Sequence, residues 1–267
     1  MVIIMLNQTI LIVSLYILFG AFEFPFYAQP GQRLNGKIRN IIYGSILLLT
    51  GLFTVGFVYY LIPFQTKQLP DRGLGFSLMI VFVYIFLQDV IFYWYHRAQH
   101  KYDFLWVIHE LHHSDTELNV TTSKRTYWLD QPIQTLLILI PLNYFVGLDN
   151  GAVILLPIIS TFFLFFTHAN LRLHLGFLTP VITGPQLHRI HHSNLPQHRD
   201  KNLAQFFPII DIVFGTYYKP RFDEFPTTGT HDLASDAPIS QVIKKPLIFW
   251  ETKIIKTYQR VVGILFH

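Results

Sequence analysis

Long apolar segments constrain the fold of this chain more than any other feature of its sequence. A helix needs about 20 apolar residues to cross the ~30 Å hydrocarbon layer of a bilayer, and residues 2–20, 38–62 and 74–95 meet that length. Two shorter segments, 132–148 and 151–167, each contain a proline and are separated by GLDNG. We expect them to form a helical hairpin that dips into the membrane or just crosses it.

Composition and charge agree with a membrane protein. Of the 267 residues, 51% are apolar and 13% are charged, whereas a soluble domain has about 25% charged residues. There is no cysteine, which excludes disulfides, cysteine-ligated zinc and iron–sulfur clusters. The net charge of +4 is small and forms no basic patch, so we expect no nucleic-acid partner.

The basic residues predict an orientation. They follow the first and third apolar segments and the hairpin, as in Arg33, Lys37, Arg97, Lys101, Arg172 and Arg189. By the positive-inside rule the N-terminus lies outside and the histidine-rich segments lie in the cytosol. The first segment lacks a cleavage site and is interpreted as a retained helix. A bacterial inner membrane or the endoplasmic reticulum is the expected location.

We therefore predict one all-α integral-membrane domain over residues 1–267, with four or five membrane-embedded segments. A cytosolic helical cap, about 96–131 and 168–220, completes it. Residues 245–265 have apolar side chains at helical spacing, with Lys253, Lys256 and Arg260 between them. This pattern suits an amphipathic helix in the membrane interface, or equally one packed on the cap.

The pattern H-x-x-H-H-S occurs twice, as HELHHS at 109–114 and HRIHHS at 188–193. Residues i, i+3 and i+4 share one face of a helix, so the three histidines of each motif should point together. A third pair stands at i, i+4. The eight histidines are His96, His100, His109, His112, His113, His188, His191 and His192. Divalent metals are the usual reason to gather imidazoles, and eight are too many for one ion, so we predict a dinuclear site.

Imidazole suits zinc, copper, iron and nickel alike. Without cysteine and with few carboxylates nearby, a redox metal fits better than structural zinc. One alternative is a zinc-dependent membrane hydrolase, because His109, Glu110 and His113 form H-E-x-x-H. That reading leaves six clustered histidines unexplained. A metal transporter is a weaker alternative, since the apolar segments contain almost no ionisable residue except Asp89.

The three histidine boxes together resemble those of the fatty acid hydroxylase / sterol desaturase superfamily of membrane di-iron enzymes. The resemblance covers about Leu87 to Pro220, with DVIFYWYHRAQH before the first pair, FFTHAN before the last box and DKNLAQFFPIIDIVFGTYYKP after it. It implies that the eight box histidines are iron ligands and that His168 is a ninth. His174 and His198 are further candidates, while His231 and His267 are expected to lie outside the site.

The resemblance also implies the chemistry. Two iron ions, which zinc can replace in purified protein, would activate O2 to hydroxylate or desaturate a lipid, or to cleave an ether after hydroxylation. The lipid would be a sterol, a fatty acyl chain or an ether lipid. The sequence contains no nucleotide-binding or haem-binding domain, so a ferredoxin or small cytochrome with its reductase would supply electrons.

Three polar residues are expected to support the ligands. Asp89 lies two helical turns before His96, where its carboxylate would accept a ring N–H from a ligand and fix the imidazole tautomer. The alternative is an ion pair with Arg97 or Lys101. Asn202 and Asp211 are expected either to support ligands in the same way or to hold a turn. Tyr93, Trp94 and Tyr95 are interpreted as an aromatic belt at the membrane surface.

Overall fold

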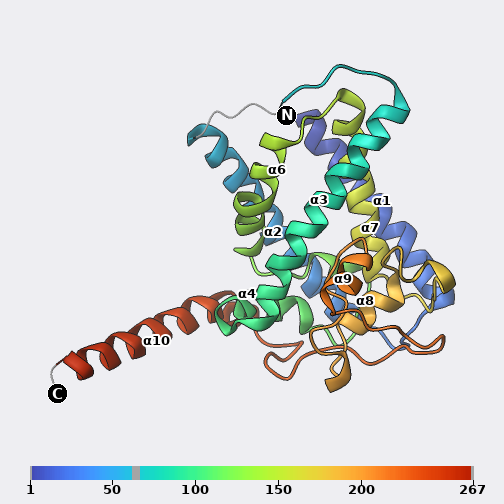
Figure 1. The fold of residues 1–267 in the computed structure, drawn as a ribbon. Helices are drawn as coiled ribbons and strands as arrows, with labels where there is room; N and C mark the ends of the chain where they lie inside the picture. Colours follow the sequence, from blue (N-terminus) through green and yellow to red (C-terminus); the bar gives the residue numbers. More distant parts are fainter. Residues whose placement is uncertain (1, 62–66, 266–267) are drawn as a thin grey trace.

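The computed structural model describes residues 2–61 and 67–265 as an all-helical chain, with no β-strand among them. Residue 62, at the end of the second predicted segment, and His267 lie outside these ranges. Long helices stand side by side and form an upright bundle (Figure 1). They are α1 (Val2–Phe26), α2 (Leu34–Leu61), α3 (Leu74–Lys101) and α7 (Asn150–His168).

Three helical stretches of the described residues are long and apolar enough to cross a membrane, namely Leu34–Val58, Leu74–Lys101 and Asn150–His168. Ile10–Phe26 of α1 is a shorter apolar stretch. The prediction of an all-helical membrane protein is therefore confirmed, whereas the number of four or five embedded segments stays a prediction. The third segment continues to Lys101 as one helix, so His96 and His100 stand on its last two turns.

The first half of the predicted hairpin is interrupted. It consists of α5 (Asp130–Gln134), a π-helical turn (Thr135–Leu139) and α6 (Ile140–Phe145), followed by α7. Pro141 has no N–H to donate to the preceding turn, and the wider π-turn lies directly before it. The second half is close to its predicted bounds and continues through Pro157.

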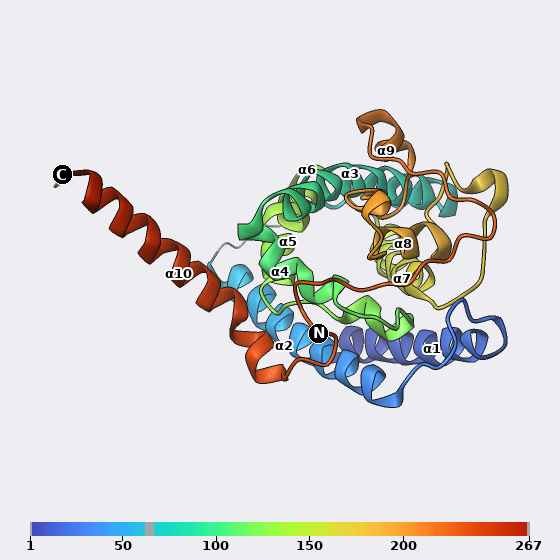
Figure 2. The same ribbon diagram turned by 90° about the horizontal axis from the view of Figure 1, so that it is seen from below.

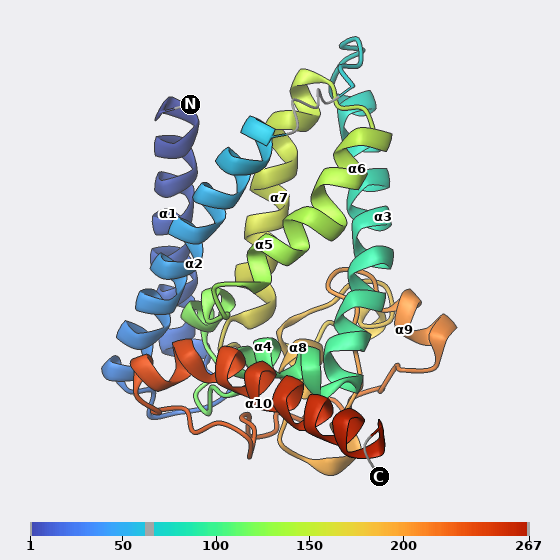
Figure 3. The same cartoon turned by 90° about the vertical axis from the view of Figure 1, so that its left-hand side faces the viewer.

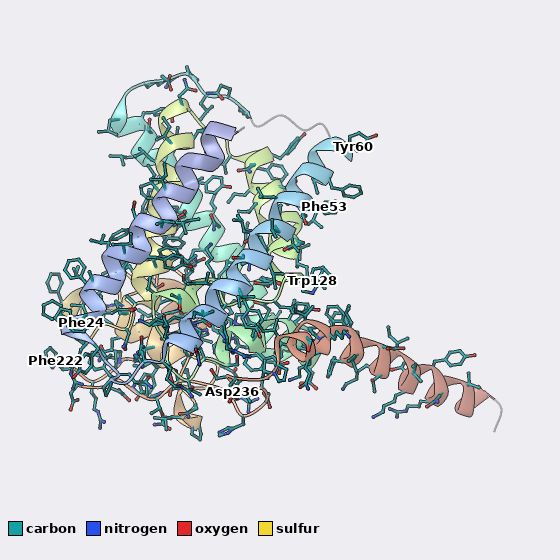
Figure 4. All side chains as sticks on the ribbon, turned by 180° about the vertical axis from the view of Figure 1, so that it is seen from behind. Phe24, Phe53, Tyr60, Trp128, Phe222 and Asp236 are labelled. Atoms are coloured by element: carbon teal, nitrogen blue, oxygen red, sulfur yellow. The ribbon has the colours of Figure 1, made fainter. Side chains whose placement is uncertain are left out.

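Apolar side chains cover the outside of the bundle as well as its inside. Phe53 and Tyr60, which project from α2 in Figure 4, are 74% and 84% exposed. Inside, α3 and α7 approach so closely that a Cβ on Gly151 would clash with the Ser77 hydroxyl. A bundle that packs tightly inside and exposes aromatic side chains is what a lipid environment requires.

Short elements gather at the lower end of the bundle, where α3 ends (Figures 1 and 2). They are α4 (Asp103–His113), the 3-10 helices Val120–Lys124, Gly176–Leu178 and Pro196–His198, α8 (Pro185–His191) and α9 (Ile209–Phe214). Trp94 is half exposed, as predicted for a belt residue. The prediction was wrong for Tyr93, which is fully buried and whose hydroxyl lies 2.9 Å from that of Thr216.

The C-terminal helix, α10 (Ile239–Leu265), begins six residues earlier than predicted. It extends away from the body (Figures 1 and 2) and runs across the direction of the bundle (Figure 3). Its first turns pack on α4, where Val242 is buried and Trp250 donates a hydrogen bond to the Phe104 carbonyl. Farther along, Ile254 and Tyr258 are exposed. The first turns of α10 are thus packed on the body, as one prediction expected. The rest of the helix is exposed, so its predicted place in the membrane interface stays a prediction.

Candidate metal centre

Nine histidines form two groups at the junction of the bundle and its lower end. The ring nitrogens within each group lie within 4.8 Å of one another. The first group contains His96, His100, His109, His113 and His191, and the second contains His112, His168, His188 and His192. Helices α3, α4, α7 and α8 supply all of them except His192, which directly follows α8. The residues predicted as eight ligands and a ninth are therefore brought together.

Each H-x-x-H-H box divides its side chains between the groups. His109 and His113, one turn apart on α4, enter the first group, and His112 enters the second. In the other box His188 and His192 enter the second group, while His191 enters the first. The three histidines of each box do lie close together, as predicted, but their side chains divide between two sites.

Backbone carbonyls orient several of the rings. Nδ1 of His96 lies 2.7 Å from the Leu203 carbonyl, and Nδ1 of His191 lies 2.9 Å from that of Lys201. A carbonyl can only accept, so each Nδ1 carries the proton and donates. The Nε2 atom of each ring is then unprotonated, which is the form that binds a metal.

The pair His112 and His168 tests whether these residues fit a metal. Both Nδ1 atoms face carbonyl oxygens, at 3.3 Å from Arg125 and 2.8 Å from Leu164. Their Nε2 atoms, 3.1 Å apart, therefore meet lone pair to lone pair. Such a contact is repulsive unless a cation lies between the two nitrogens. The donor set fits a metal ion.

Burial keeps the imidazoles neutral. Their pKa values lie well below the ordinary value of 6.5 for His109, His112, His113, His188 and His192, first because burial disfavours the charged form and second because other imidazoles lie close by. Burial lowers the pKa of His191 to about 4. At neutral pH these rings are ready to bind metal without first losing a proton.

Two further candidates lie outside both groups. His198 is fully buried, but its Nε2 lies 3.1 Å from the Glu224 carboxylate. Nδ1 of His174 accepts a hydrogen bond from the backbone N–H of Gly176. Among the described residues the structure therefore offers no support for either as a ligand. His231, as expected, belongs to neither group.

The expected role of Asp89 was wrong. Its carboxylate accepts hydrogen bonds from three consecutive backbone N–H groups, of Gln205, Phe206 and Phe207, at 2.7–2.9 Å. Backbone N–H donors can stabilise a buried carboxylate in place of a cation or an imidazole. Asp89 therefore acts on His96 only indirectly, by holding the segment whose Leu203 carbonyl orients that ring.

Asp211 and Asn202 hold the same segment. The Asp211 carboxylate accepts from the N–H groups of Leu203 and Ala204, and the Asn202 side chain accepts from the N–H of Tyr218. Neither is in hydrogen-bond contact with a grouped histidine. Of the two roles predicted for Asp211 and Asn202, the structure supports the second, which is to hold a turn.

Sequence reasoning missed several partners of the rings. They are the carbonyls of Leu164, Arg125, Lys201 and Leu203, together with the Asp200 carboxylate, which lies 3.3 Å from Nδ1 of His100. A backbone carbonyl has no sequence signature. Asp200 and Asn202 are residue types that favour tight turns, and both adopt positive φ here, but that signal indicates only the turn and not the contact of Asp200 with His100.

Glu110 follows His109 but belongs to neither group. Its carboxylate pairs with Lys245 of α10 at 2.6 Å. A hydrolase built on H-E-x-x-H needs this glutamate as a free base beside the metal. Its pairing with Lys245 does not favour that alternative.

Fold and site together define a helical membrane protein with a histidine-lined metal-binding site. The chain belongs to the fatty acid hydroxylase family, whose model matches residues 81–216, about half of the chain. That match begins within α3 and ends just after α9, so it includes every grouped histidine.

Its relatives include two kinds of lipid oxygenase. The alkylglycerol monooxygenase of Xenopus tropicalis is 28% identical over 85% of this chain and 50% of its own length, and that of Homo sapiens is 26% identical over 84% and 50%. An ornithine lipid hydroxylase of Rhizobium tropici is 31% identical over 73% and 61%. The chain thus spans about half the length of the alkylglycerol monooxygenases. No solved structure matches it.

Proposed function

We propose that this protein is an O2-dependent di-iron enzyme that oxidises a membrane lipid at an unactivated C–H bond. The observation that carries the proposal is the division of nine histidines, eight of them buried and His100 partly buried, into groups of five and four. Each group is large enough to hold one ion. Hydroxylation is the favoured reaction because the relatives are named as monooxygenases or hydroxylases. Desaturation uses the same type of site.

The ligand number of the first group favours iron over structural zinc. Structural zinc takes four ligands in a tetrahedron, whereas the first group offers five imidazoles. Neighbouring Nε2 atoms, such as those of His96 and His109, lie 2.9 Å apart. These two nitrogens could therefore ligate the same ion. A site with more than four ligands is consistent with the five imidazoles of this group.

Iron bound there supplies the O2 activation that an unactivated C–H bond requires. In hydroxylation one oxygen atom enters the C–H bond, and the other leaves as water with two protons and two electrons. The chain's own residues hold the geometry: the Leu203 and Lys201 carbonyls orient imidazoles, and burial keeps those imidazoles neutral. The electrons come from a separate protein, a ferredoxin or a small cytochrome with its reductase.

The proposed setting is a membrane with four or five embedded segments and the histidine groups on the cytosolic side. Apolar helices let a lipid reach the site from the bilayer, and a cytosolic cap lets the electron donor reach it from the other direction. A bacterial inner membrane or the endoplasmic reticulum would provide both. Sterols, fatty acyl chains and ether lipids are the candidate substrates, and the alkylglycerol relatives favour a lipid with an ether.

Metal content and O2-dependent turnover test the proposal together. We expect about two irons per chain after iron-supplemented, chelator-free purification, and a lipid product that forms only with O2 and a reductant. A His112→Ala, His191→Ala double variant should lose both, because it removes one ligand from each group. His174→Ala, a histidine outside the groups, is the matched control. A single zinc that survives the double substitution would overturn the proposal.

A further inference from the structure

A cavity of about 810 Å³ opens directly on the first histidine group. It lies between α4, the start of α10 and the loops around residues 193–200 and 229–232. His100, His113 and His191 form part of its wall, and all three belong to that group. No histidine of the second group lines it. A cavity of this size suits a small molecule or the polar part of a larger one.

The wall of this cavity contains charges of both signs. Its carboxylates are Asp103, Glu110, Asp200 and Asp232, and its cations are Lys101, Arg199 and Lys245. Glu110 and Lys245 already pair with each other, and the Asp200 carboxylate lies beside His100. The charges left for a ligand are therefore the carboxylates Asp103 and Asp232 and the cations Lys101 and Arg199, so a carboxylate alone or an amine alone would meet like as well as unlike charges. A headgroup that has both an amine and an acid can pair with each kind of side chain.

The length of α3 indicates the level of the site relative to the membrane. Its 28 residues extend about 42 Å, at 1.5 Å per residue, which exceeds the hydrocarbon layer of ~30 Å. About 20 residues from Leu74 fill that layer and end near Trp94, which is half exposed, as residues at a membrane surface are. His96 and His100 follow on the next turns. The first group therefore lies at the level of lipid headgroups rather than in the hydrocarbon.

We propose, resting on the function proposed above, that this cavity binds a zwitterionic lipid headgroup and that the oxidised carbon lies within a few bonds of it. An acyl carbon far from the headgroup stays in the hydrocarbon layer and would have to fold back to reach His100 or His191. A carbon next to the headgroup reaches the first group without such folding. The cavity wall then selects the lipid class by charge.

Binding to the metal-free full chain in detergent tests the inference separately from turnover. The probes are N-octanoyl-ornithine, which has an amine and a carboxylate, and octanoate, which has the same chain but no amine. We expect the zwitterionic probe to bind about tenfold more tightly in a calorimetric titration, since hydrogen bonds to charged groups are the stronger ones. Equal binding of the two probes would overturn the inference.

Two isosteric variants locate the binding. Asp232→Asn and Arg199→Gln each remove one charge from the wall and should reduce the preference to about threefold or less. Asp223→Asn and Arg260→Gln alter exposed charges outside the cavity and should leave it unchanged. A preference that both wall variants retain would contradict the assignment. Because the titration needs no iron, a protein that binds the probe but oxidises no lipid would refute the proposed function and leave this inference standing.

Discussion

His112 and His113 are adjacent residues of α4, yet their imidazoles enter different histidine groups. Successive residues on a helix point about 100° apart, and here the two directions lead to two sites. His191 and His192 repeat the relationship with the assignments exchanged. Each group thus receives an i, i+4 pair from one box and a single ring from the other, so the two boxes form opposite walls of one paired site.

This division predicts that neighbouring substitutions affect different ions. His191→Ala should reduce bound metal from about two ions per chain to about one by weakening the first group, and His192→Ala should do the same through the second. The double variant should bind almost none. Elemental analysis by mass spectrometry gives the stoichiometry, with His174→Ala as the control. If either single substitution removed both ions, the groups would not be separate sites.

The hydrogen bonds of Asp89 predict a loss of stability. Asp89→Asn leaves one acceptor oxygen for three backbone N–H groups and turns an amide N–H₂ toward one of them. We expect a loss of about 3 kcal/mol, because buried donors are left without partners. Thermal unfolding of the metal-free protein measures it. The exposed Asp223 provides the control, as Asp223→Asn should unfold like the wild type.

The same variant distinguishes the structural role of Asp89 from the direct one expected from sequence. A direct partner of an imidazole would change metal affinity more than metal-free stability. If Asp89→Asn melted normally without metal but bound iron poorly, the backbone contacts would not be its main function.

The sequence allowed the membership of the site to be predicted but not its internal arrangement. Helical spacing gathers His109, His112 and His113 on one face, so their proximity could be read from the pattern. Their division between two groups depends on where α8 lies, which local spacing does not encode. Asp89 was recognised as unusual because a charge in an apolar helix is costly. Its partners are backbone groups more than a hundred residues away, and these have no signature in the sequence.

The lowered pKa of His191 predicts that the metal-free protein is sensitive to acid. This imidazole has a pKa of about 4 in the folded chain and about 6.5 in the unfolded chain. Between these values the unfolded state binds more protons, so stability present above pH ~6.5 is lost as pH falls toward ~4. The loss from this residue alone is about 3 kcal/mol, and the other buried histidines act in the same direction.

Chelator-treated protein should therefore show a falling unfolding temperature from pH 7 to pH 4.5. His191→Gln should flatten the profile, and His174→Gln should not. Metal-loaded protein should keep its unfolding temperature to lower pH, because protons must then compete with the ions for the ring nitrogens. An unfolding temperature of the metal-free chain that stays constant over this range would contradict the burial of neutral imidazoles.

The exposed part of α10 predicts a helix that lies on the membrane surface. Ile254 and Lys256 are both exposed and stand about 200° apart around the helix axis. The chain has no native cysteine, so Ile254→Cys and Lys256→Cys each provide a unique site for an environment-sensitive fluorophore. In anionic vesicles we expect the label at 254 to shift to the blue and to be quenched by spin-labelled lipid chains, while the label at 256 stays in water. Equal, water-like emission from both positions would show that this face of α10 does not contact lipid.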